Sequence, residues 1–501
     1  MLSQTLRHIL NILFFMVKPL GSPERVFLLL LTIMVFIVLW SYEHTQDKDG
    51  ATLLKDAPIL SPVTNLNDLS EIVIATRLGP TTYLTDPDGK TVGLEHDLGV
   101  SFGEYLGKPV RFLVLDNLDQ VLTAVKLHKA HFAAAAVHET NELKKEFDFT
   151  LAYQNSHPVV VYNNNFNNSI KSLDDLVGKK VGVVPDPTHL NILTQFKQKN
   201  SQLSWVSYPR GDIDLDLLQK VYEGTVDFAI SDSNTVAIAQ HYYPDLVVAL
   251  NLSPSSPLAW AFPKDEKNPL FIAAMSFFNR WDHGGNLSEV VERYYGHINA
   301  LDREDSSVFM VKRASRLPKF TQIFKKAQAL TNIDWRLLAA VAYQESRWDN
   351  NALSPTGVRG LMMLTADTAD HLHVSNRLDP NESVPAAALY LKQLEESVPK
   401  SVPEPDRVWM ALAAYNVGLA HLEDARKIAQ RKGMNPNAWN DIKKTLPLLS
   451  VPAVFSNTQY GFARGGEPVN YVENIRSYYD ILSRFEPNYR PGFKFLGLMN
   501  K

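Results

Sequence analysis

The chain contains no cysteine among its 501 residues. Thiolate zinc sites, iron–sulfur clusters, disulfide frameworks and cysteine nucleophiles are therefore excluded. Glycine and proline are also scarce, at 24 and 29 residues, which is too few for a collagen-like or low-complexity chain. The net charge is only −4, because 50 basic residues are balanced by 54 acidic ones. A large nucleic-acid footprint needs a basic domain, so nucleic acid is not an expected partner.

Histidine pairs are the remaining candidates for metal ligands. His128 and His131 are spaced HxxH, and His371 and His373 are spaced HxH. Neither pair has the neighbouring acid that would complete a zinc motif. The sequence also shows no glycine-rich phosphate loop and no Ser-His-Asp pattern. We therefore expect neither a metal nor a cofactor.

A long apolar run lies near the N-terminus. Residues 26–40 read VFLLLLTIMVFIVLW, with basic residues before them and acidic residues after them. This charge pattern predicts a cytoplasmic N-terminus and export of the remainder of the chain. The run is shorter than the roughly 20 residues of a typical spanning helix, and a cleaved signal peptide is the alternative. No small-x-small cleavage site comes after it, so residues 1–45 are interpreted as a signal or retained membrane-anchor segment and 46–66 as a linker.

Residues 67–300 alternate between short apolar runs and helical spacing. Residues 71–76 (EIVIAT) and 110–115 (VRFLVL) are typical of strands, whereas 118–127 (LDQVLTAVKL) has helical spacing. This alternation predicts an α/β domain with mainly parallel sheets. Its length favours two lobes over one.

Residues 301–501 show helical periodicity and almost no strand-type run. Leu337, Val341 and Glu345 fall at i, i+4 and i+8. Tyr471 and Ile475 begin another repeat of this kind. The second domain is therefore predicted to be all-α.

Glu345 is the candidate catalytic residue. Asp334 can cap a helix that begins at Trp335, and Glu345 lies near the end of that helix on the face of Leu337 and Val341. A carboxyl group on an apolar face is desolvated, which raises its pKa and lets it act as a general acid near neutral pH. The alternative is a solvated glutamate at a helix end, which is what most such residues are.

Three further motifs come after Glu345-Ser346 along the chain. They are Gly360-Leu361-Met362, Ala414-Tyr415-Asn416 and Tyr471. In this order and spacing the four motifs resemble those of the lysozyme-like lytic transglycosylase family, which are ES, GLM, AYN and a late tyrosine. The resemblance implies a lysozyme-like fold for residues 301–501 and an enzyme whose substrate is the peptidoglycan glycan strand.

The same resemblance implies a reaction that consumes no water. Glu345 would protonate the oxygen between N-acetylmuramic acid and N-acetylglucosamine, and would then deprotonate the muramic 6-hydroxyl to close a 1,6-anhydro ring. A second carboxylate, which two-carboxylate glycosidases need, is not evident in the motifs. Met363 stands where many family members have Gln, whose amide could bind a sugar. The residues that the resemblance assigns to substrate binding or orientation are Ser354, Met363, Tyr415, Asn416 and Tyr471.

Residues 93–113, 172–184 and 223–235 resemble the family-3 solute-binding proteins, in which two α/β lobes close on a ligand. Asp232 matches the acid that contacts a ligand α-amino group in that family. Leu143 stands at the position of the arginine for the ligand carboxylate, so a free amino acid is not the expected ligand. A cell-wall peptide fragment is one interpretation. The alternative is a pocket that binds nothing and only spaces or docks the enzyme.

The predicted fold is thus multidomain: a two-lobed, α/β periplasmic-binding-protein-like domain followed by an all-α lysozyme-like domain. Three functions stay open, namely a lytic transglycosylase, a hydrolytic muramidase on the same fold, and a non-enzymatic glycan or muropeptide sensor. Glu345 within its full set of motifs favours the first. Because a ligand-closing domain directly precedes the catalytic one, across a short polar segment near Asn299–Ser306, we expect it to be regulatory.

The predicted location is the periplasmic side of the cell envelope, in association with a membrane. The apolar run points to an anchor in the inner membrane, whereas the family resemblance implies a peripheral position on the outer membrane. The expected partners are peptidoglycan glycan strands, muropeptides at the N-terminal domain, and the membrane.

Overall fold

The computed structural model describes residues 50–85, 91–166, 170–208, 214–265, 267–283, 286–298, 300–354 and 357–490. The predicted signal or anchor segment, residues 1–45, lies outside the described residues. Part of the predicted linker forms a short helix, α3 (Gly50–Asp56). In the part of the chain that the structure describes, no helix is long and apolar enough to span a membrane. The chain divides into two compact units, Met1–Asp56 and Ala57–Lys501. The second unit holds the helical half and three sheets, the smallest of which pairs β2 (Leu84–Thr85) with β3 (Thr91–Val92).

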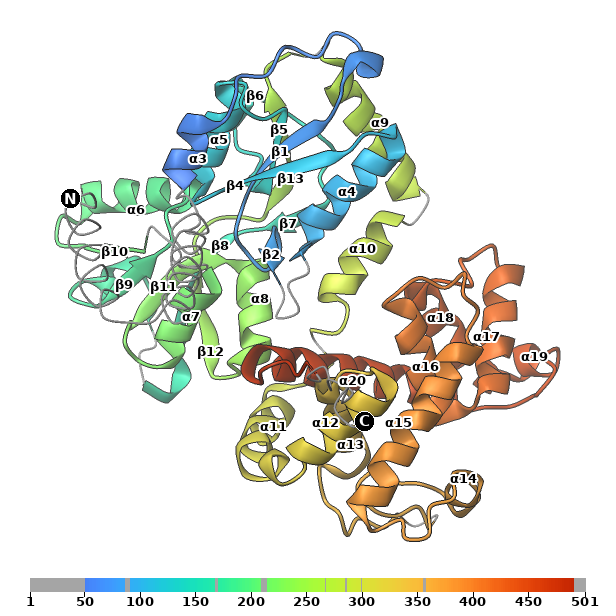
Figure 1. Cartoon of the computed structure of the whole chain (residues 1–501). Coiled ribbons are helices and arrows are strands. Elements are labelled where there is room, and N and C mark those ends of the chain that lie inside the picture. The colour runs from blue at the N-terminus through green and yellow to red at the C-terminus, as the bar shows by residue number, and fades with distance from the viewer. Residues whose placement is uncertain are drawn as a thin grey trace, which may run out of the picture. The chain divides into compact units, whose positions relative to one another are not determined.

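The first lobe of the α/β half is built on a six-stranded sheet with the order β4-β1-β5-β13-β6, and β7 pairs with β13 (Figure 1). Strand β1 runs parallel to β4 and β5, whereas β13 runs antiparallel to β5, β6 and β7. The sheet is therefore mixed, and the expectation of mainly parallel sheets was wrong. The strands are β1 (Ile72–Arg77), β4 (Val110–Leu115), β5 (Phe132–His138), β6 (Phe147–Phe149), β7 (Gln154–Ser156) and β13 (Ser256–Pro263).

The second lobe has a five-stranded sheet with the order β10-β9-β11-β8-β12. It is also mixed, because β8 runs antiparallel to both β11 and β12. The chain crosses between the lobes twice, from β7 to β8 through His157 and from β12 to β13 through residues 252–255. Two such crossings form a hinge between the lobes. The strands are β8 (Pro158–Asn163), β9 (Val181–Val183), β10 (Val206–Ser207), β11 (Phe228–Asp232) and β12 (Leu246–Asn251).

Each lobe has its own apolar core. The first lobe packs Phe102 and Trp260 against the strands, and α10 joins this core through Leu287 and Val290. The second lobe packs its helices against the other sheet. The helices are α4 (Leu94–Leu106), α5 (Leu118–Lys126), α6 (Pro187–Lys199), α7 (Asp214–Tyr222), α8 (Ser233–Tyr242), α9 (Pro269–His283) and α10 (Asn286–Tyr295).

The helical half surrounds one long core, with α13 at its centre. Every residue of α13 from Trp335 to Tyr343 is buried, so the helix is enclosed on all sides rather than along one apolar stripe. Ala339, Ala340 and Ala342 lie on this helix, and their small side chains let its neighbours approach closely. The helices are α11 (Arg303–Ser315), α12 (Thr321–Thr331), α13 (Trp335–Ser346), α14 (Ala366–His371), α15 (Pro380–Ser397), α16 (Asp406–Val417), α17 (Leu419–Arg431), α18 (Trp439–Thr445), α19 (Pro452–Phe455) and α20 (Gly466–Phe485).

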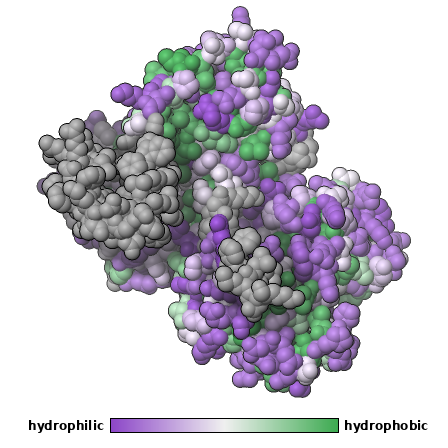
Figure 2. All heavy atoms as spheres, in the orientation of Figure 1, coloured by the Kyte–Doolittle hydropathy of each residue, from purple (hydrophilic) through white to green (hydrophobic). Residues whose placement is uncertain are grey.

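The all-α prediction for this half is confirmed, since β structure in its described residues is limited to isolated bridges between Leu353, Arg359 and Leu364. Hydrophilic residues dominate the described surface on the face drawn in Figure 2, and hydrophobic residues form small patches there. The last helix, α20, packs alongside α13 and α16 (Figure 1).

Candidate active site

Glu345 lies in the last turn of α13. The helix begins as predicted, because the Asp334 carboxylate accepts a hydrogen bond from the backbone N–H of Arg336 at 2.8 Å. It ends at Ser346, and the next residue, Arg347, adopts a left-handed conformation with φ of 52°. Burial raises the pKa of Glu345 to about 7, and a hydrogen bond from Tyr471 offsets only part of this effect. A carboxylic acid with this pKa is partly protonated at neutral pH, as a general acid requires.

Tyr471 brings its hydroxyl group directly to that carboxyl group. The Tyr471 hydroxyl donates to Oε1 of Glu345 at 2.6 Å, and the side chain is almost entirely buried. Burial and the charge of Glu345 raise the pKa of Tyr471 well above its usual value, so the tyrosine stays a donor. Its helix, α20, begins at Gly466, five residues before the start that the sequence suggested.

Ser346 ties the GLM segment to α13. Its hydroxyl group lies 2.8 Å from the carbonyl oxygen of Leu361 and 3.0 Å from that of Ala342. Gly360 has φ of +82°, and a Cβ atom there would lie 2.0 Å from the carbonyl oxygen of Arg377. Only glycine fits this position. The ES and GLM motifs are therefore parts of one structural unit beside Glu345.

Ser354 and Met363 flank this segment. The Ser354 hydroxyl accepts a hydrogen bond from the backbone N–H of Val358 at 3.2 Å, which closes a turn. Met363 has φ of +46° and is half-buried. No hydrogen bond among the described residues joins either side chain to Glu345, so their assignment to the substrate stays a prediction.

Tyr415 lies near the end of α16, with Asn416 exposed beside it. The Tyr415 hydroxyl group is buried and has no hydrogen-bond partner among the described residues. Burial and the charge of Glu345 raise the pKa of Tyr415 well above its usual value, which places its hydroxyl group within the electrostatic reach of the acid. Tyr390, on α15, packs its ring 5.6 Å from the Tyr415 ring. Sequence reasoning missed Tyr390, because nothing in its local pattern distinguishes it from a core aromatic residue.

Asp232 lies at the end of β11, between the two lobes. His138 of the first lobe and His189 of the second both reach its Oδ1 atom, with their Nε2 atoms at 3.0 and 3.2 Å. Burial opposes ionisation, but His189 and His138 hold the pKa of Asp232 well below its usual range. Arg77 and Asp186 form a second cross-lobe pair at 3.8 Å.

A cavity of about 20 Å³ lies beside Asp232 and is also lined by Arg77, and it has room for about one water molecule. Sequence reasoning found Asp232 but missed its partners, since His138 is 94 residues away. Leu143 lies in a short 3-10 turn, Leu143–Lys145, and does not line this cavity.

The two histidine pairs, His128/His131 and His371/His373, were considered above as possible metal ligands. The described residues contain no group of three or more His, Asp or Glu side chains arranged to hold a metal ion. His131 instead has a structural contact, because its Nδ1 atom accepts a hydrogen bond from the backbone N–H of Val73 at 2.9 Å.

Two family models match the chain. The Transglycosylase SLT domain matches residues 322–438, and the bacterial extracellular solute-binding proteins of family 3 match residues 71–297. A membrane-bound lytic murein transglycosylase F from Methylobacillus flagellatus is 43% identical over 448 residues, which cover 89% of this chain and 94% of the relative. The chain belongs to that family of lytic transglycosylases.

A second relative of this name, from Nitrosospira multiformis, is 40% identical over 447 residues, which cover 89% of this chain and 92% of the relative. Family membership confirms both resemblances drawn from the motifs, as well as the two-domain fold class. A solved structure of an ancestral arginine-binding protein covers 45% of this chain and 99% of its own, with 23% identity and a TM-score of 0.41.

Proposed function

We propose that this lytic transglycosylase cleaves the bond between N-acetylmuramic acid and N-acetylglucosamine without water, with Glu345 as the single acid and base. One observation carries the proposal. The Glu345 carboxyl group, whose pKa burial raises to about 7, accepts a 2.6 Å hydrogen bond from the Tyr471 hydroxyl, so an acid and a donor that can stabilise its anion lie together. A two-carboxylate mechanism would need a second acid about 5–10 Å away, and none is evident in the sequence motifs.

The geometry suits each step of such a reaction. Glu345 starts protonated, because burial disfavours its charge, and it donates its proton to the departing glycosidic oxygen. The resulting carboxylate is stabilised by the Tyr471 hydroxyl at 2.6 Å. It then takes the proton of the muramic 6-hydroxyl, whose oxygen attacks the anomeric carbon and closes the 1,6-anhydro ring. Tyr415, whose buried hydroxyl group has no hydrogen-bond partner among the described residues, is proposed to bind the sugar. Ser354, Met363 and Asn416 are proposed as further substrate contacts.

The products distinguish this reaction from hydrolysis. We expect purified full-length protein to release muropeptides that are one water lighter than those released by a hydrolytic muramidase. Mass spectrometry of a peptidoglycan digest measures this directly. Products of the hydrated mass would establish the muramidase alternative. A folded sample that releases no products would favour the glycan sensor.

We also propose that the solute-binding half binds cell-wall peptide fragments and regulates the helical half. Support comes from the cleft, where charged groups of both lobes meet directly. The amino group of a peptide fragment would take the place of a histidine at Asp232. The fragment is larger than the 20 Å³ cavity beside Asp232, so its binding would separate the lobes. Allosteric coupling of this kind typically changes activity by about 5–150-fold.

The regulatory proposal is tested by adding soluble muropeptides to the full-length protein. We expect the rate of glycan cleavage to change, and we expect Asp232→Asn to weaken this response while keeping the basal rate. An unchanged rate at saturating muropeptide would leave this half as a spacer or docking module.

We propose a location on the periplasmic side of the envelope, in association with a membrane. The relatives are named membrane-bound, and the apolar run at residues 26–40 comes after basic residues. An inner-membrane anchor is the expectation from that run, and a peripheral outer-membrane position is the expectation from the family resemblance. Density-gradient separation of the two membranes, followed by immunodetection, decides between them.

A further inference from the structure

Helix α20 holds α13 at both of its ends. Tyr471 contacts Glu345 at the C-terminal end of α13. Two turns later on α20, the Tyr479 hydroxyl donates to Asp334, the residue that caps the N-terminus of α13, at 3.0 Å. Between them, the ring of Tyr478 packs 4.7 Å from the ring of Tyr343. The position of α20 therefore determines how Tyr471 meets the catalytic acid.

Another face of α20 contacts the first lobe of the solute-binding half. Nη2 of Arg476 donates to the backbone carbonyl oxygens of Glu292 and Arg293, at 3.3 and 3.2 Å, in the last turn of α10. These carbonyls form the negative end of a helix, which favours a cation. The guanidinium is buried and also forms two hydrogen bonds of 3.0 Å with Glu473.

Helix α10 is fastened to the first lobe. The Tyr294 hydroxyl, in α10, donates to Asp97 at 2.8 Å, and Arg293 forms an ion pair with the same carboxylate at 3.4 Å. Asp97 lies in the first turn of α4, a helix that packs into the core of the first lobe through Leu94 and Leu98. A movement of the first lobe would therefore carry α10, and with it the contact to Arg476.

The next residue of α20 contacts the second lobe. Nε2 of His241 donates to the carbonyl oxygen of Ser477 at 3.0 Å. His241 lies at the end of α8, whose other end begins directly after Asp232 in the cleft. Arg476 thus contacts α10 of the first lobe, whereas its neighbour Ser477 contacts α8 of the second lobe through its carbonyl oxygen. The Ser477 hydroxyl also donates to the carbonyl oxygen of His297, just after α10, at 2.7 Å. A change in the angle between the lobes would thus alter contacts within a single turn of α20, the helix labelled in Figure 1.

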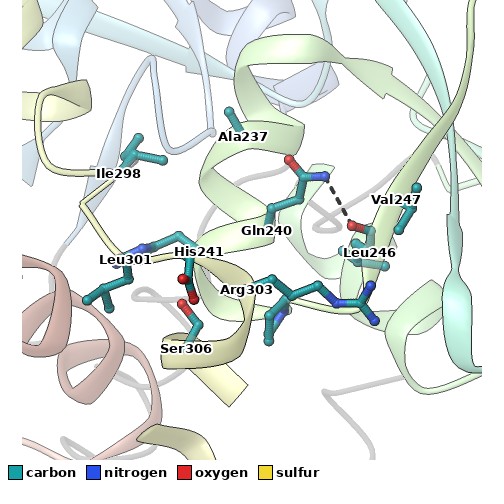
Figure 3. Close-up of a pocket in the computed structure, with 11 residues that line it drawn as sticks. Ala237, Gln240, His241, Leu246, Val247, Ile298, Leu301, Arg303 and Ser306 are labelled. Atoms are coloured by element: carbon teal, nitrogen blue, oxygen red, sulfur yellow. Dashed lines mark hydrogen bonds between the residues drawn. The ribbon is translucent and has the colours of Figure 1, made fainter. Parts of the chain in front are cut away.

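The junction around these contacts is incompletely packed. A cavity of about 360 Å³ lies beside Arg476, between Asp97, Tyr294 and Trp409. A second cavity of about 280 Å³ lies beside His241. Its lining residues include Gln240 and His241 of α8 together with Leu301 and Ser306, all labelled in Figure 3. Close-packed interiors resist movement, whereas empty space of this size leaves room for the lobes to shift.

We propose that Arg476 is a positioning residue for catalysis: by joining α20 to the last turn of α10, it sets how the Tyr471 hydroxyl meets Glu345. The inference rests on the proposed function and adds the residue through which the solute-binding half acts on the catalytic pair. It requires no ligand, because the contact joins residues of the chain itself.

The test uses full-length protein and glycan strands from which the stem peptides have been removed, so that no peptide fragment can act on the cleft. The main variant is Glu473→Gln with Arg476→Met, which removes both members of the buried pair. Glu292, which lies 3.9 Å from Arg476, keeps its ion pair with Lys443. The new amide oxygen can still accept the hydrogen bond that Trp439 donates to Glu473 at 2.6 Å. Arg476→Lys keeps the positive charge but removes the planar guanidinium with its several donors. It tests whether the charge alone is enough to hold α20 against α10. Arg431→Met, at an exposed arginine of α17, is the control.

We expect the double variant to lower kcat by roughly 2–30-fold, the usual range for residues that modulate coupling. Its KM should change little, since Arg476 contacts α10 and not Glu345. Loss of the Tyr471 hydrogen bond would raise the pKa of Glu345, so the alkaline limb of the pH–rate profile should move to higher pH, as in Tyr471→Phe. Arg476→Lys should recover only part of the rate, and Arg431→Met should match the parent.

A double-mutant cycle decides the matter. In the Tyr471→Phe background, we expect removal of the Glu473–Arg476 pair to have almost no further effect on kcat. Additive effects, or a lower kcat with an unmoved alkaline limb, would show that Arg476 only stabilises the fold and would overturn the proposal. Thermal denaturation of every variant identifies any that fail to fold. If the parent protein itself released no anhydro products, the proposed function would fail, independently of Arg476.

Discussion

The Ser346 hydroxyl group donates a hydrogen bond to the carbonyl oxygen of Leu361 at 2.8 Å, so the residue directly after the proposed catalytic acid holds the GLM segment in place. Both residues are buried, and 15 positions separate them in the sequence. In the ES dipeptide, Glu345 thus supplies the proposed acid, and Ser346 supplies a hydrogen bond that holds the neighbouring segment.

Ser346→Ala should destabilise the protein by about 1–3 kcal/mol, because the buried Leu361 carbonyl loses its partner. We expect kcat to fall as the segment moves away from Glu345. Ser397→Ala is a matched control, since its hydroxyl group forms a 2.7 Å bond within α15 and is exposed. Urea denaturation and glycan cleavage measure both effects. Equal stability losses in the two variants would contradict the structural role of Ser346.

Glu345→Gln should keep the fold and lower the rate by about 10²–10⁴-fold, since an amide cannot donate a proton as a carboxylic acid does. Release of anhydro-muropeptides from purified protein is the measurement. Glu396→Gln, an exposed glutamate on α15, is the control and should retain the parent rate. Parent-like activity of Glu345→Gln would rule out the assignment.

The rate should be highest at mildly acidic pH and should decline as the pH rises through about 7, where Glu345 loses the proton that it must donate. Buffers of constant ionic strength from about pH 4.5 to about pH 9 give the profile. A rate that climbs steadily to the alkaline end of this range would be incompatible with a carboxylic general acid.

Stability should depend on the same proton. Folding raises the pKa of Glu345 from 4.5 to about 7, so between these values the native state binds a proton that the unfolded chain has lost. The contribution is full below pH 4.5 and is lost as the pH rises through 7, by an amount on the order of 3 kcal/mol. Glu95 adds a similar trend, because burial raises its pKa to about 7 as well. The difference between the parent and Glu345→Gln in denaturation at about pH 5 and about pH 8 isolates the Glu345 part.

Gly360→Ala should be far more harmful than Gly433→Ala. Both glycines have positive φ, +82° and +71°, so the backbone strain is similar and costs about 1–2 kcal/mol. A Cβ atom at Gly360 meets the Arg377 carbonyl at 2.0 Å, whereas nothing lies within 4 Å of one at Gly433. We expect Gly360→Ala alone to lower activity as well as thermal stability. Equal melting temperatures for the two variants would exclude a packing role for Gly360.

The helical half was largely predictable because its signals are local. The cap at Asp334, the helix that begins after it and the place of Glu345 near the helix end can all be inferred from residues within one short segment. The complete burial of α13 could not, since alanine side chains carry little periodic signal and their burial depends on the surrounding helices. The Tyr471–Glu345 contact spans 126 positions, and only the motif resemblance indicated it.

The α/β half was predicted in kind but not in topology. Strand β13 reads as an ordinary apolar run, yet it enters the first sheet antiparallel after the chain has crossed the hinge twice. Pairings that depend on such long-range crossings leave no trace in local spacing. For the same reason, the contacts of His138 and His189 with Asp232 and of Arg476 with α10 could not be predicted. Each of them joins segments that are distant in the sequence.

Helix α20 also has a consequence for the order in which activity arises during synthesis. A nascent chain emerges from its N-terminal end, so the segment with Glu345 is made well before α20, residues 466–485. Until α20 docks, Glu345 has no tyrosine donor and α13 lacks a large part of its enclosure. Chains that stall or are cut before α20 would therefore carry the acid without the group that positions it, and wall-cleaving activity would begin only after α20 has been made and has docked.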